Sequence, residues 1–135
     1  MLIAKKLKEE NIAEYLLYMW QIEDIIRANK LNIDIIDKQI ISGFEQPQNV
    51  KNEKREWYEN LIDMMRREDV MEKAHLIINK NVISELTELH NRLLKSPQET
   101  EYTEAYYKTL PFIVELRSKT QDKNTPELET CLAAL

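Results

Sequence analysis

The sequence predicts an all-α protein, an up-and-down bundle of about five helices followed by a short C-terminal helix fragment. Only one of the 135 residues, Gly43, is a glycine, whereas proteins on average use about 7% glycine. Apolar residues recur at intervals of three and four along most of the chain, which is the spacing of amphipathic helices. Tight hairpins and phosphate-binding loops need several glycines, so β-sandwiches and nucleotide-binding folds are excluded. The length predicts a single domain over residues 1–135.

The first predicted helix begins at Asn11. Asn11 and Glu14 form a capping-box pattern, in which side chains satisfy the first backbone N–H groups of a helix. Leu2, Ile3 and Leu7 extend the helical pattern toward the N-terminus by a turn or two. The predicted apolar face consists of Ile12, Tyr15, Leu16, Met19, Ile22 and Ile26.

A second, shorter helix is expected over residues 32–42. It carries Ile33, Ile36 and Ile40 on one side, and Gly43 ends it, as glycine commonly does at helix C-termini. The stretch 43–52, GFEQPQNVKN, combines a proline with several amides and is predicted to be a loop.

A change of phase divides residues 54–95, which contain no glycine or proline. The apolar residues from Tyr58 to Met65 predict another core position near residue 69, where the chain has charged side chains instead. Apolar residues resume in a different phase, so a helix break is expected at 68–70. The following helix is expected to be central and to run to Lys95, where Ser96-Pro97 ends it. Its main apolar stripe is Met71, Ala74, Ile78, Val82, Leu89 and Leu93, and a second one is Leu76, Ile83 and Leu94.

The fifth helix is expected over residues 100–120, with Pro111 bending it from inside. Thr125 is then a typical N-cap, with Pro126 at the first position of a final helix. The chain ends soon afterwards, and so short a helix is marginal in water on its own. We therefore expect its three leucines to dock on the bundle or across a dimer interface, or the chain to be a truncated form of a longer one. These leucines are Leu128, Leu132 and Leu135.

Charge and hydropathy exclude several classes of partner. The chain has 19 Lys and Arg against 24 Asp and Glu, a net charge of −5 with the signs interspersed, so it lacks the basic field that nucleic acid binding requires. Its apolar runs are too short to span a membrane, and its N-terminus lacks the features of a secretion signal. The only cysteine, Cys131, cannot form an intrachain disulfide. These observations favour a cytoplasmic protein.

Glu23 is the first candidate functional residue. A projection at about 100° per residue places it near the middle of the apolar face of the first helix. An isolated carboxylate would be costly there, so we expect a buried ion pair with Arg27, four residues later. The alternative is a carboxylate tuned for function in a pocket.

Glu72 and His75 have the E-x-x-H spacing that places a carboxylate and an imidazole on one helix face, as in di-iron bundle proteins. Those proteins need the motif twice, and here Thr87 stands where a second glutamate would precede His90. Glu23, Glu72 and His75 are the candidate metal ligands from this incomplete set. The alternative is that His75 is a hydrogen-bonded core histidine, and no cofactor is expected.

No complete nucleophilic site is visible. Cys131 has no histidine near it in the sequence and is typical of a small packing residue, and neither histidine has the arginine spacing of helical ribonucleases. Aromatic residues at helical spacing, such as Tyr102 and Tyr106, either line the core or form a partner-binding surface. Trp20 lies at the edge of its apolar stripe, where partial burial or an interface is expected.

Five segments together resemble one protein family: NIAEYLLYMWQIEDIIRANK, EKAHL, LTELHNRLL, YYKTLPFIVELR and TPELETCLAAL. Over essentially its whole length the chain resembles a family of short, all-helical bacterial proteins known only as a domain of unknown function. The resemblance implies that the chain normally continues past Leu135 and that a glycine belongs near Asp69. It brings no activity, ligand or catalytic residue.

The sequence therefore favours a cytoplasmic interaction or scaffold protein that self-associates as a homodimer or binds another protein. The candidate interface residues are Trp20, Leu128, Leu132 and Leu135. The alternative function is a metal-dependent or acid/base enzyme, with Glu23, Glu72 and His75 as ligands or proton acceptors in the bundle core.

Overall fold

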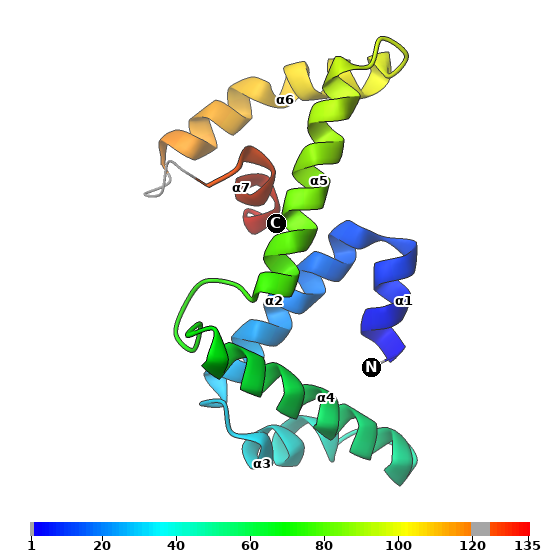
Figure 1. The fold of residues 1–135 in the computed structure, drawn as a ribbon, viewed down its shortest axis with the longest axis vertical. Helices are drawn as coiled ribbons and strands as arrows, with labels where there is room; N and C mark the ends of the chain where they lie inside the picture. Colours follow the sequence, from blue (N-terminus) through cyan, green and yellow to red (C-terminus); the bar gives the residue numbers. More distant parts are fainter. Residues whose placement is uncertain (1, 120–124) are drawn as a thin grey trace. The chain divides into compact units, whose positions relative to one another are not determined.

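The computed structural model describes residues 2–119 and 125–135, and this part of the chain is all-α, as the sequence predicts (Figure 1). In these ranges seven α-helices and one π-helical segment follow one another, without a strand. The elements are α1 Leu2–Glu10, α2 Ile12–Ala28, α3 Ile33–Ile36, η1 Asp37–Ile41, α4 Gln48–Arg67, α5 Ile77–Lys95, α6 Thr100–Ser118 and α7 Glu127–Ala133.

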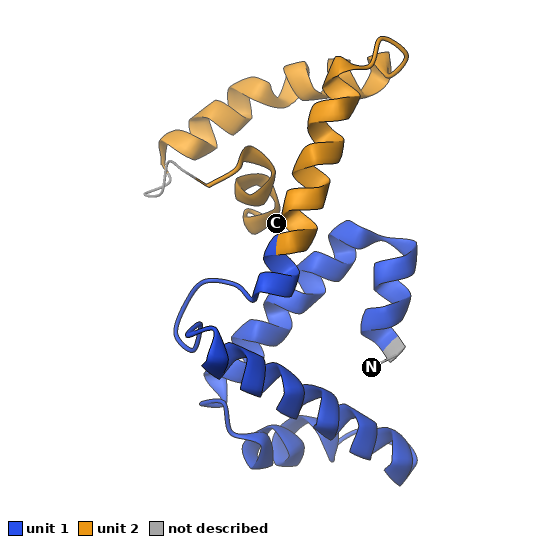
Figure 2. Ribbon diagram, in the orientation of Figure 1, with its two compact units in different colours: residues 1–80 blue, residues 81–135 orange. Residues whose placement is uncertain are grey.

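The chain divides into two compact units, an N-terminal unit of residues 1–80 and a C-terminal unit of residues 81–135 (Figure 2). The sequence predicts a single domain and does not predict this division. The boundary falls inside α5, so the first turn of this helix belongs to the N-terminal unit.

Apolar and aromatic side chains from α2, α3, η1 and α4 form most of the core of the N-terminal unit. α2 begins after Asn11, whose Oδ1 accepts a hydrogen bond from the Glu14 amide at 3.2 Å, the predicted cap. α1 is a separate helix that ends at Glu10 and does not continue into α2. The buried side chains are Tyr15, Leu16, Met19, Ile22 and Ile26 from α2, Ile36 and Ile41 from the next two elements, and Tyr58, Leu61, Ile62 and Met65 from α4.

The second predicted helix is divided into α3 and η1, and the loop after it is shorter than expected. Asn32 caps α3, because its side chain accepts hydrogen bonds from two amides of the first turn. α4 begins at Gln48 instead of near residue 54. Pro47 precedes its first turn, and the Gln48 side chain donates to Asn52 Oδ1 at 3.0 Å. The amides that suggest a loop therefore belong to the first turns of α4.

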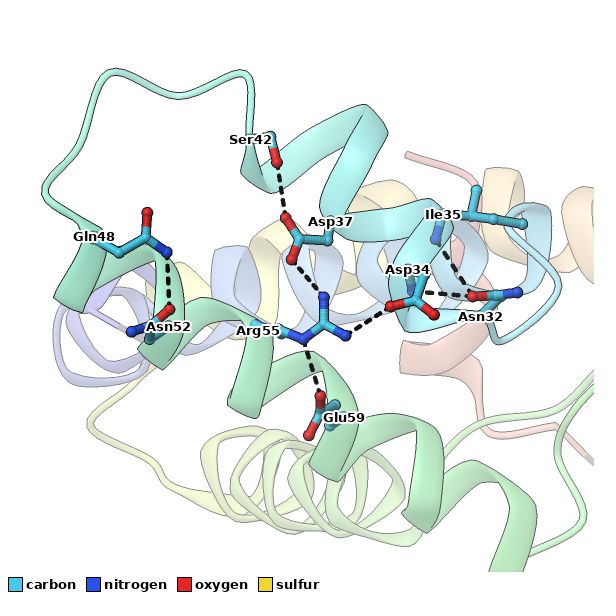
Figure 3. A network of polar contacts seen from close by, with 9 residues as sticks. All are labelled: Asn32, Asp34, Ile35, Asp37, Ser42, Gln48, Asn52, Arg55 and Glu59. Carbon is cyan, nitrogen blue, oxygen red and sulfur yellow. Dashed lines mark hydrogen bonds and ion pairs between the residues drawn. The ribbon is translucent and has the colours of Figure 1, made fainter.

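Arg55 of α4 joins this helix to α3 and η1 through carboxylates (Figure 3). Its guanidinium contacts Asp34 at 2.7 Å, Asp37 at 2.5 Å and Glu59 at 3.2 Å. Hydrogen bonds from Arg55 and from Ser42 hold the pKa of Asp37 below its usual value. Because the network is partly exposed, its main effect is to orient the helices, and its contribution to stability is small.

Two helices of the N-terminal unit, α2 and α4, end in left-handed turns without a glycine, and after α2 a second residue, Leu31, is also left-handed, with φ 55°. Lys30 has φ 58° and Asp69 has φ 56°, the conformation that glycine favours just after a helix. The next residues, Leu31 and Val70, donate their amide hydrogens to carbonyl oxygens of the last helical turn, at 2.9 and 3.0 Å. Both are buried, and this burial offsets the strain, which is about 1–2 kcal/mol for a residue other than glycine.

The predicted break after α4 is present, but the next helix does not resume at Val70. Residues 68–76 form an irregular link, and α5 begins at Ile77. Met71 and Ala74, both expected on the core stripe of that helix, are exposed, and Ala74 has a left-handed φ of 74°. The sequence pattern underestimates the break because no glycine or proline marks its length.

α6 and α7 lie close to their predicted positions. Pro111 is inside α6, and the expected helix end at Thr120 lies outside the described residues. The N-cap of α7 is Pro126 and makes no side-chain hydrogen bond, so the cap expected from Thr125 is wrong. The Thr125 carbonyl instead accepts a hydrogen bond from Arg117 at 2.6 Å.

The core of the C-terminal unit is small. The predicted main stripe of α5 is only partly buried, since Ile78 and Leu89 are exposed, whereas Leu76 and Ile83 from the predicted second stripe are buried. Val82 of the main stripe is also buried, so burial is divided between the two stripes. Among the described residues of 81–135, the buried side chains are Val82, Ile83, Ile113, Thr130 and Leu132.

Candidate functional site

Glu23 of α2 is the most deeply buried charged side chain and binds the link of residues 68–76. Its side chain is 1% exposed. Oε2 accepts a hydrogen bond from the Leu76 amide at 3.0 Å, and Oε1 lies 3.1 Å from His75 Nδ1. A carboxylate only accepts, so His75 Nδ1 carries the hydrogen of this contact. The structure thus brings together two of the residues that the sequence singles out.

Arg27 does not pair with Glu23. Its Nη2 donates to the carbonyl oxygens of Val70 at 3.1 Å and Ala74 at 2.5 Å, and its Nη1 contacts Asp24 at 3.3 Å. The expected ion pair is replaced because the irregular link presents backbone carbonyl groups with no helical partner, and the guanidinium satisfies two of them.

Trp20 completes the same face of α2 and stacks on the His75 ring. The ring centroids are 4.7 Å apart and the planes differ by 19°, so Trp20, a candidate interface residue, packs on its own chain. Trp20 Nε1 and both polar side-chain atoms of the fully buried Asn79 have no hydrogen-bond partner in the described structure. Each such buried group costs about 1–3 kcal/mol.

The arrangement around Glu23 anchors the link to α2. A carboxylate that holds a histidine ring is also a catalytic device, but both oxygens of Glu23 are engaged and the carboxylate is inaccessible to a substrate. Glu72 lies exposed in the link and not on a helix, so the E-x-x-H spacing does not place it beside His75 on a helix face. In the residues that were described, no three metal-ligating side chains are grouped to hold an ion.

A pocket of about 230 Å³ lies in the C-terminal unit, between α5, α6 and α7. A hydrogen bond joins His90 Nδ1 to the Tyr102 hydroxyl, and the Tyr106 hydroxyl donates to Glu127 Oε2 at 2.8 Å. The lining residues are His90, Tyr102, Ala105, Tyr106, Thr109, Ile113, Glu127, Leu128 and Cys131.

Glu127 and burial both affect the ionisable groups of this pocket. Its hydrogen bond with Tyr106, together with burial, raises the pKa of Tyr106 to about 12. Burial, followed by the charge of Glu127, raises the pKa of the Cys131 thiol. Cys131 is therefore a poor nucleophile at neutral pH, in agreement with the packing role expected for it.

The three leucines of the last helix have different environments. Leu132 is buried in the C-terminal unit, Leu128 lines the pocket, and Leu135 is 87% exposed. On α6, Tyr107 and Val114 are also largely exposed.

The chain was compared with protein-family models, curated proteins and solved structures. A family model described as a domain of unknown function (DUF4924) matches residues 1–135. The chain belongs to this family. No curated protein and no solved structure matches the chain.

The resemblance to a domain of unknown function is thus confirmed, and the DUF4924 description assigns no activity. The structure also gives a physical reason for the glycine expected near Asp69, since Asp69 itself has the left-handed φ that glycine favours. Among the described residues of this DUF4924 chain, every helix is too short or too polar to cross a membrane.

The pocket is the feature that sequence reasoning missed. Tyr102, Tyr106 and Ile113 recur on one face of α6, and this signal is visible in the pattern. The contribution of Glu127 was not visible, because it lies 21 residues beyond Tyr106 and reaches the pocket only when α7 packs on α6.

Proposed function

We propose that this chain is a protein-interaction module that self-associates through the outer face of α6, defined by Tyr107, Pro111 and Val114. The observation that carries the proposal is that α6, described over its whole length, buries only Ile113. A long helix with one buried residue gains little from packing within its own unit. A partner that covers the outward apolar side chains of α6 would bury the apolar surface that its own unit leaves exposed.

The outer face of α6 has the geometry of a helix-pairing stripe. Its three residues follow one another at intervals of four and three, so they lie along one line of the helix. Tyr107 is 61% exposed and Val114 is 59% exposed. Pro111 removes one backbone hydrogen bond at this face and adds an apolar ring between the other two side chains.

Charges beside the outer face are arranged for a second copy of the same helix. Glu104, Lys108, Glu115 and Lys119 form one flank of the stripe, and within the helix Glu115 pairs with Lys119 at 3.5 Å. In an antiparallel pair of α6 helices related by a two-fold axis, Tyr107 of one copy meets Val114 of the other. This register brings Lys108 next to Glu115 of the second copy, and Glu104 next to Lys119, and the two-fold axis repeats both contacts. A parallel pair lacks this complementarity.

The proposal retains the cytoplasm as the compartment, since Cys131 is a free thiol and free thiols are typical of reducing environments. The second candidate function is an acid/base role for His75, and the Glu23 contact favours it. It ranks below self-association because anchoring of the link already accounts for the same contact.

Charge reversal tests the proposed pairing. Sedimentation or light scattering of the full chain should show a dimer, and Lys108→Glu or Glu115→Lys should each weaken it by about tenfold, or about 1.4 kcal/mol, because each places like charges in contact twice. The double variant Lys108→Glu/Glu115→Lys should restore dimerisation, because the contact is re-formed with its polarity exchanged.

Phe112 provides the matched apolar control. It is more exposed than Tyr107 or Val114, at 69%, but its position on the helix is off the outer face. Val114→Asp should abolish the dimer, whereas Phe112→Ser should leave it intact. A strictly monomeric wild-type chain, or a double charge variant no better than the single ones, would contradict the proposal.

A further inference from the structure

The pocket of the C-terminal unit is lined mainly by aromatic and aliphatic side chains. It combines three rings, those of His90, Tyr102 and Tyr106, with aliphatic side chains and a single carboxylate, and no lysine or arginine contributes to it. Pockets of this kind, mainly apolar with a few converging polar groups, are typical ligand sites. At about 230 Å³, this one accommodates a small molecule or one long side chain.

The three rings line the cavity, and the His90 ring contacts the other two edge to face. His90 lies 5.6 Å from Tyr102 and 5.0 Å from Tyr106 between ring centroids, with interplanar angles of 71° and 63°. A cation within about 6 Å of such rings is attracted to their negative faces. Groups of aromatic rings are therefore suited to binding organic cations. Burial of the alkyl groups of such a cation also contributes favourable binding free energy.

Glu127 supplies a negative charge that no described ion pair neutralises. It accepts a hydrogen bond from Tyr106, which is neutral, and it lies in the first turn of α7. The raised pKa values of Tyr106 and Cys131 keep both groups uncharged, and Glu127 contributes to both shifts. Among the lining residues Glu127 is the single carboxylate, and its charge disfavours anionic ligands, although the charge of Arg117 also acts on Cys131.

We propose that this pocket binds an organic ammonium group, with the cationic head against the Tyr106 ring and beside the Glu127 carboxylate, and its alkyl groups against Ile113 and Leu128. The inference goes beyond self-association, because these α6 residues are rotated by about 100° or more from Tyr107 of the outer face, although the rings of Tyr106 and Tyr107 lie 5.3 Å apart between centroids. The same chemistry is offered by a free small amine and by a lysine or methylated lysine side chain of another protein.

Titration of the full chain with matched probes tests the charge requirement. Choline and its neutral isostere 3,3-dimethylbutan-1-ol have nearly the same shape, so binding of the two, followed by NMR shifts of the C-terminal unit, isolates the charge. Choline should bind about tenfold more tightly. N-acetyl-trimethyllysine amide is the third probe, and whether it or choline binds more tightly identifies the source of the ammonium group.

Three variants complete the experiment. Glu127→Gln keeps the size of the side chain and an acceptor for Tyr106 but removes the charge, and should weaken choline binding by about tenfold. Tyr106→Leu removes a ring and should have a similar effect. Glu101→Gln removes an exposed charge of α6 outside the pocket and should leave binding unchanged. Equal affinity for choline and the neutral isostere, or no binding of any ammonium probe, would overturn the proposal.

Discussion

The two units of this chain differ in how completely they bury their apolar residues. In the N-terminal unit the apolar faces of α2 and α4 are closed over one core, and the largest fully buried side chains of the molecule all lie there. In the C-terminal unit the long helix α6 contributes only Ile113 to a core, while its aromatic residues line a pocket or face outward. Similar amphipathic helices thus produce a closed core in one unit and accessible surfaces in the other.

The difference shows which unit to examine for function. Buried polar contacts of the N-terminal unit, such as Glu23 with Leu76, connect parts of the chain to one another. The polar groups of the C-terminal pocket, such as Glu127, converge on a cavity. Structural roles account for the first set, and binding roles are more natural for the second.

Truncation of one core residue in each unit should give the largest effects and compares the units directly. Met65 is fully buried, so Met65→Ala should lower the free energy of unfolding by about 4 kcal/mol, within the usual range for such cavities. Ile113→Ala should cost about 2 kcal/mol, because Ile113 is less completely buried than Met65. Native-state hydrogen exchange measures both, because it reports protection separately for the amides of each unit.

The conservative variants Met65→Leu and Ile113→Val serve as controls, since each retains most of the buried volume and should cost less than about 1.5 kcal/mol. Equal losses for the two alanine variants would contradict the contrast between a closed and an open unit.

Removal of the charge of Glu23 should give an intermediate effect. Glu23→Gln leaves one acceptor for the Leu76 amide and the His75 ring, so one partner loses its hydrogen bond inside the protein. We expect a loss of about 2 kcal/mol, together with faster exchange of the Leu76 amide.

Glu72→Gln is the matched control for that experiment, because Glu72 is exposed in the same region and its neutralisation should change stability by less than about 0.5 kcal/mol. If Glu23→Gln were as harmless as Glu72→Gln, the carboxylate would not anchor the link, and an acid/base role would become the better explanation of its burial.

The parts of the structure that the sequence predicts are those set by local patterns. The Asn11 cap and the apolar stripe of α2 depend on residues within one or two turns, and both are found. The length of the link is set by contacts such as that of Glu23 with His75, 52 positions apart. No periodicity encodes such contacts, so the pattern predicts a helix where the chain is irregular.

The candidate site was partly predictable for the same reason. Burial of Glu23 follows from its position on a helical face, but its partner does not, and the nearest cation in sequence, Arg27, binds the link backbone instead. The irregular carbonyl groups that attract Arg27 exist only once the link has folded.

Relief of backbone strain should give the smallest effect and confine it to one unit. Asp69→Gly replaces a residue at φ 56° with one that adopts this conformation without strain, so the free energy of unfolding of the N-terminal unit should rise by about 1 kcal/mol. Asp63→Gly, inside α4, is the matched control and should lower it by about 1 kcal/mol, since glycine is unfavourable in a helix interior. Hydrogen exchange should show both changes in residues 1–80 and neither in residues 81–135. A destabilising Asp69→Gly would mean that the Asp69 side chain contributes more than its backbone strain costs, and the glycine expected at this turn would then lack a physical basis.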